Sequence, residues 1–83
     1  MIEENNVITL DINGTETNVL VETIFAVEET SFVSMIPLSQ VEKDNPQQII
    51  YIYEEKNDEI YFYEPTDEQF CIAEKALEKI YSK

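Results

Sequence analysis

The chain has 83 residues, of which 18 are aspartate or glutamate and five are lysine, and it contains neither arginine nor histidine. Its formal net charge of −13 repels nucleic-acid phosphates and anionic lipid headgroups, so we expect neither nucleic-acid nor membrane binding. A hydrophobic fraction of 43% is ordinary for a globular protein, and we expect one small acidic domain over residues 1–83.

The first half of the chain predicts three strands joined by short turns. Apolar and polar side chains alternate over residues 7–12, which is typical of a strand with one buried face. Asn13 and Gly14 come next and predict a type I′ hairpin turn, because both positions of that turn need positive φ. A second strand is expected over about 15–27 and a third over about 31–37.

A third hairpin is predicted after the polar loop over 39–48, with strands over about 49–55 and 60–64. The register expected for it pairs Lys56 with Ile60. That register places four tyrosines on one face of the sheet, namely Tyr51, Tyr53, Tyr61 and Tyr63. The opposite face then carries Ile50, Ile52, Ile60 and Phe62. A shift of one residue would mix the two sets.

The last expected element is a helix over about 66–82, after Pro65. Thr66 and Gln69 have the spacing of a capping box. Apolar side chains recur on one stripe at helical spacing, namely Phe70, Ala73, Ala76, Leu77, Ile80 and Tyr81. We expect this stripe to cover the sheet face opposite to the tyrosines, because that face gains most from leaving water. The fold class predicted is α+β: a five-stranded antiparallel meander of hairpins with one C-terminal helix packed on one face.

The order of several local features is distinctive. These are Ile8-Thr9-Leu10, a turn at Gly14 followed by Glu16, a strand from Phe32 to Ile36 and Pro37, the Tyr/Ile strands, and Asp67-Glu68-x-Phe70. This order resembles the YrzB-like family of small acidic bacterial proteins, a domain of unknown function. Family members often carry a dense acidic run in the middle loop, where this chain has Gln40, Lys43, Asn45, Gln47 and Gln48. The resemblance implies a cytoplasmic bacterial protein, and it supplies no catalytic or binding residues.

The residue types offer no recognisable catalytic, cofactor or metal site. Without histidine a nucleophile lacks its usual base, and the single cysteine, Cys71, can form neither an internal disulfide nor a zinc site. Acidic residues such as Glu28 and Glu29 fall in expected turns, where solvated carboxylates are the simpler interpretation. We therefore expect no enzyme activity, no cofactor and no metal. A lone cysteine and the absence of a targeting segment favour the cytoplasm.

The tyrosine set, Tyr51, Tyr53, Tyr61 and Tyr63, has two interpretations. Tyrosine favours strands and stabilises cross-strand pairs, but it is also enriched at binding hot spots. We expect a non-enzymatic protein-interaction or regulatory module, monomeric or weakly homodimeric, whose protein partner has a basic or mixed surface. The alternative is an acidic nucleic-acid mimic that blocks a DNA- or RNA-binding protein. A compact aromatic patch would favour the first function, and ordered rows of carboxylates the second.

Overall fold

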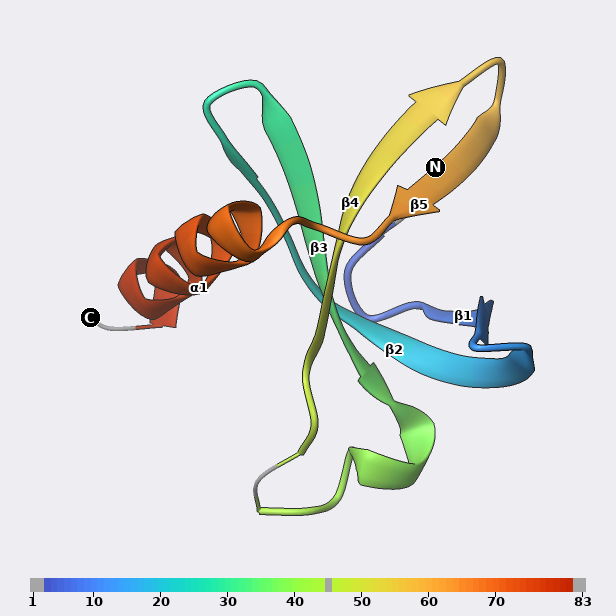
Figure 1. Ribbon diagram of the computed structural model, residues 1–83. Helices are drawn as coiled ribbons and strands as arrows, with labels where there is room; N and C mark the ends of the chain where they lie inside the picture. The colour runs from blue at the N-terminus through green and yellow to red at the C-terminus, as the bar shows by residue number, and fades with distance from the viewer. Residues whose placement is uncertain (1–2, 45, 82–83) are drawn as a thin grey trace.

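A computed structural model describes residues 3–44 and 46–81. Five strands form one antiparallel sheet in the order β1-β2-β3-β4-β5, and one helix follows them (Figure 1). The elements are β1 (Val7–Ile12), β2 (Thr15–Val27), β3 (Thr30–Pro37), the short 3-10 helix η1 (Leu38–Gln40), β4 (Ile49–Lys56), β5 (Glu59–Tyr63) and α1 (Asp67–Tyr81). The predicted meander with one C-terminal helix is confirmed, and the observed strand bounds lie within one residue of the predicted ones. The predicted end of the helix, Ser82, lies outside the described residues.

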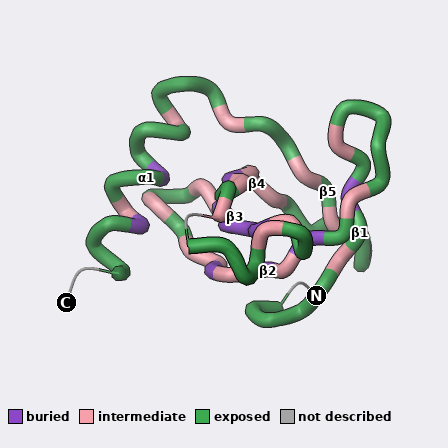
Figure 2. The backbone as a smooth tube through the Cα atoms, turned by 90° about the horizontal axis from the view of Figure 1, so that it is seen from below, coloured by how far each residue is buried: buried purple, intermediate pink, exposed green. Residues whose placement is uncertain are grey.

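The sheet curls into a half-barrel. Side chains from the first and last strands meet in one cluster, which includes Leu10 of β1 and Phe62 of β5. The buried members of this cluster are Leu10, Val19, Val21, Val33 and Met35. We call this side of the sheet the inner face, and the side that carries α1 the outer face. Figure 2 shows buried positions on the strands and exposed residues along the turns and most of α1.

Backbone irregularities help to produce the curl and the hairpins. β2 contains a bulge between Val21 and Thr23, where its pairing with β3 shifts, and a bulge increases the local twist of a strand. Asn13 and Gly14 have φ of 52° and 82°, which confirms the positive φ predicted for both turn positions. The turn between β2 and β3 places Glu28 at φ 57°, a conformation that is unfavourable for a long side chain.

The third hairpin has a different register from the predicted one. Asn57 and Asp58 adopt φ of 51° and 67°, so these two residues alone form the turn, and Lys56 pairs with Glu59 instead of Ile60. Asparagine and aspartate enter the left-handed region more readily than other non-glycine residues, which is the physical reason for the shorter turn. The shift moves every side chain of β5 to the other face.

The four tyrosines therefore do not share one face, and that prediction is wrong. Tyr51 and Tyr53 pack with the inner cluster, and the ring centroids of Tyr51 and Phe62 lie 6.4 Å apart. Tyr61 and Tyr63 lie on the outer face, where 42% and 45% of their surfaces are exposed. Phe62, which was predicted to lie beneath the helix, belongs to the inner face instead.

The helix begins with the predicted capping box. The backbone N–H of Thr66 donates to Oε1 of Gln69 at 2.9 Å, and the backbone N–H of Gln69 donates to Oγ1 of Thr66 at 3.2 Å. These two bonds satisfy donors that the first turn of a helix leaves unpaired. Asp67 and Glu68 in the first turn add negative charge at the positive end of the helix dipole.

α1 packs on the outer face through a narrow contact. Ala73 and Leu77 are buried against Phe32 of β3 and Ile50 of β4. Other large side chains of the predicted stripe remain more than one third exposed, namely Phe70, Ile80 and Tyr81. The helix thus confirms its predicted place on one face, but it covers only part of that face. Ile52, further along β4, is only partly buried.

Candidate interaction groove

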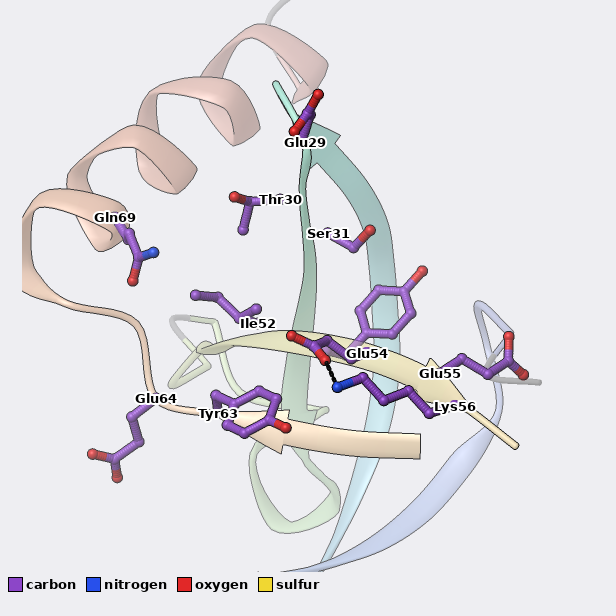
Figure 3. A pocket seen from close by; sticks show the side chains of 11 residues that line it. Glu29, Thr30, Ser31, Ile52, Glu54, Glu55, Lys56, Tyr63, Glu64 and Gln69 are labelled. Atoms are coloured by element: carbon purple, nitrogen blue, oxygen red, sulfur yellow. Dashed lines mark ion pairs between the residues drawn. The ribbon is translucent and has the colours of Figure 1, made fainter. Parts of the chain in front are cut away.

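An open groove of about 790 Å³ lies on the outer face beside the part of the sheet that α1 covers. Ile52 of β4 and Tyr63 of β5 line it, and the two residues pair across the strands. Figure 3 shows these side chains on the two strands, with Thr30 on the neighbouring β3 hairpin and Gln69 on the first turn of the helix. The groove therefore combines an apolar floor with walls from three parts of the fold.

Carboxylates surround this floor. Four glutamates line the groove, namely Glu29, Glu54, Glu55 and Glu64. Lys56 is the cation among the described lining residues, and its Nζ lies 3.0 Å from Oε2 of Glu54. The hydrogen bond that Lys56 donates to Glu54, with the charge of that carboxylate, raises the pKa of Lys56. Lys56 is therefore charged at neutral pH, yet four carboxylates face one ammonium, and the groove has an excess of negative charge.

A second polar cluster lies under the C-terminal end of α1. Oε1 of Glu22 accepts hydrogen bonds from Nε2 of Gln48 at 2.8 Å, from the hydroxyl of Tyr81 at 3.0 Å and from Oγ of Ser34 at 3.2 Å. The hydroxyl of Tyr81 also shares a hydrogen bond with Oγ1 of Thr23. Within the described part of the chain, every buried side-chain nitrogen or oxygen has a partner. This cluster therefore fastens the helix to β2 and is satisfied without a ligand.

The hydrogen bonds of the Tyr81 hydroxyl predict a loss of stability at alkaline pH. Burial raises the pKa of the Tyr81 hydroxyl; the hydrogen bond with Thr23 opposes this shift and Glu22 reinforces it. Burial also raises the pKa of Tyr51, with a further contribution from the charge of Glu64. A tyrosine whose pKa is raised in the folded state contributes its full stabilisation at pH values below the unfolded-state pKa of about 10. That contribution is lost as the pH rises through the folded-state pKa.

We therefore expect the free energy of unfolding to decrease above about pH 10. Tyr81→Phe should show a shallower decrease, because it has no hydroxyl to titrate beside Glu22. Urea denaturation at a series of pH values measures both slopes. Equal slopes in the two proteins would show that the Tyr81 hydroxyl is not linked to folding.

The predicted site residues do not lie together. Tyr63 lies in the groove, and Tyr53, which packs with the inner cluster, also contributes to the lining of the groove from β4. Tyr61 lies on the outer face beyond the lining, and its hydroxyl donates to Oε2 of Glu59 at 2.6 Å. Tyr51 packs with the inner cluster. The sequence reasoning missed Ile52, which was predicted beneath the helix but is only partly buried there; the two-residue turn could have indicated only that Tyr63 pairs with it.

Other kinds of site find little support in the described residues. Over residues 3–44 and 46–81, no group of three or more His, Cys, Asp and Glu side chains could hold a metal ion. Cys71 is exposed on the helix. The helices in this part of the chain are too short or too polar to cross a membrane.

No family model, curated protein or solved structure matches the chain. The resemblance to the YrzB-like family stays a prediction. The geometry and charge of the groove are consequently the observations that bear on function.

Proposed function

We propose that the protein is a non-enzymatic interaction module, and that the groove binds a protein segment in which lysine or arginine stands beside apolar side chains. The observation that carries this proposal is the uncovered floor of Ile52 and Tyr63 inside a border of glutamates. Apolar surface gains free energy by leaving water, and a tyrosine with an apolar ring and a wet hydroxyl is a frequent binding hot spot.

Charge selects the kind of partner. The glutamates of the groove and the net charge of −13 attract a basic protein and speed its encounter. The same charges repel an acidic partner, including a second copy of this chain. The alternative, a nucleic-acid mimic, requires carboxylates in ordered rows. In the groove the carboxylates surround an isoleucine and a tyrosine instead. This arrangement favours binding of a peptide segment over imitation of a nucleic-acid phosphate backbone.

Changing Tyr63 to serine should weaken binding by about tenfold, because it removes a ring whose truncation at a hot spot costs 1–2 kcal/mol or more. Tyr61→Ser is the matched control, since Tyr61 is similarly exposed on the same strand and the same face but does not line the groove. This control should lose less affinity. The probe is a displayed library of random short peptides, from which the wild-type protein should select sequences rich in lysine or arginine and in aliphatic residues.

Two results would contradict the proposal. One is a selection without basic residues. The other is a set of selected peptides that bind Tyr63→Ser as tightly as the wild type while binding of Tyr61→Ser is impaired.

A further inference from the structure

β5 is an edge strand whose backbone has one open side. It pairs with β4 on its other side. In an antiparallel ladder, pairs that exchange both backbone hydrogen bonds alternate with pairs that exchange none. The two-residue turn is closed by the bonded pair Lys56 and Glu59. The alternation then directs the backbone N–H and C=O groups of Ile60 and Phe62 away from β4, toward the open edge.

We propose that the partner segment binds in an extended conformation and adds to β5 as a sixth strand. This inference rests on the proposed function, since it specifies how the segment reaches the groove. Addition of a strand supplies affinity through the main chain and specificity through alternate side chains. Side chains on one side of the added strand lie beside Tyr61 and Tyr63 on the outer face. Those on the other side lie beside Ile60 and Phe62 on the inner face.

The two faces of β5 select a defined sequence pattern. On the outer face, Glu59 stands on β5 and accepts a hydrogen bond from Tyr61, and Glu54, which pairs with Lys56, lies opposite Tyr61 on the neighbouring strand. Both carboxylates favour lysine or arginine at the outward positions of the added strand. On the inner face, Ile60 and Phe62 are partly buried apolar side chains of the inner cluster. They favour valine or isoleucine at the intervening positions. The partner segment is therefore a strand of alternating basic and aliphatic residues.

The opposite edge of the sheet fits such a segment less well. β1 presents Val7, Thr9 and Asp11 on its outer side, and Glu16 lies opposite Asp11 on β2, so the two edges differ in the groove beside β5 and not in the number of carboxylates. The hydroxyl of Thr9 is already engaged with Oδ1 of Asn18 at 2.8 Å. None of the described residues that line the open groove comes from β1. A second copy of the chain is also disfavoured at β5, since it would bring glutamates against glutamates.

The test uses a capped peptide of roughly six residues, a common strand length, in which lysine and valine alternate. Ile60→Pro removes a backbone donor from the open edge while leaving the side that pairs with β4 intact. Thr9→Pro makes the matched change on β1. We expect Ile60→Pro to weaken binding by about tenfold or more, and Thr9→Pro to stay within about twofold of the wild type. Circular dichroism confirms that each variant is folded.

A second measurement separates backbone pairing from loss of the Ile60 side chain. Two peptides, one N-methylated at the lysines and the other at the valines, each lose the backbone donors on one edge of the strand. The peptide that keeps the donors facing β5 should bind as the parent does, and the other should not bind. Equal binding of both, or a larger loss in Thr9→Pro than in Ile60→Pro, overturns strand addition at β5. A wild-type dimer that Ile60→Pro dissociates would assign the edge to a second copy and overturn it too. If peptides bind through Tyr63 but ignore Ile60→Pro, the proposed function stands and strand addition fails.

Discussion

Replacing Phe32 by alanine is expected to remove most of the free energy of unfolding of the protein at room temperature. The side chain of Phe32 is 1% exposed, and its ring stacks on that of Phe25 with 5.4 Å between centroids and 19° between planes. It also packs beneath Ala73 and Leu77 of the helix. Loss of such a ring costs about 3–5 kcal/mol, whereas the total stability of a domain of this size is about 5 kcal/mol.

Urea denaturation followed by far-ultraviolet circular dichroism measures this effect. Phe25→Ala is the control, because Phe25 is only partly buried and its loss should be roughly half as large. A cost below about 1 kcal/mol for Phe32→Ala would show that the helix does not pack on this ring, and the outer face would then be more open than described.

The second large effect tests the register of the third hairpin. Phe62→Ser should lower the free energy of unfolding by about 2 kcal/mol, because a partly buried ring leaves the inner cluster and a hydroxyl replaces it. Tyr63→Ser should lower it by less than about 1 kcal/mol, since 45% of Tyr63 is exposed on the outer face.

The two midpoints in urea do not by themselves decide between the registers. The predicted register with Lys56 opposite Ile60 also puts Phe62 and Tyr63 on opposite faces, but beneath the helix and on an open face, respectively. Combining Phe62→Ser with Leu77→Ala separates these cases. The two costs should add when Phe62 is on the inner face, because the residues then have no common neighbours. Strong non-additivity would place Phe62 under the helix and contradict the observed register.

Local sequence features were sufficient to predict the element order. Alternating side chains locate the strands, the Asn13-Gly14 turn fixes the first hairpin, and Thr66 with Gln69 fixes the start of the helix. Each of these signals acts over a few residues, so no knowledge of distant contacts is needed. The acidic border of the groove likewise follows from composition.

The distribution of tyrosines could not be predicted with the same success. It depends on whether Asp58 takes a left-handed conformation, and a single residue in the turn decides which face every side chain of β5 occupies. The position of Ile52 in the groove depends on how far the helix extends over the sheet. That extent is set by the contact of Ala73 and Leu77 with Phe32, which is a long-range feature of the fold.

We have proposed that a basic, extended segment binds across the groove and the open edge of β5. The most direct measurement is a nuclear magnetic resonance titration of the wild-type protein with the alternating lysine–valine peptide, followed residue by residue at the backbone amides. We expect the largest shift changes at Ile52, Tyr63 and Gln69, with slowed exchange of the Ile60 and Phe62 amide protons. Changes centred on β1, or no change at saturating peptide, would contradict this proposal.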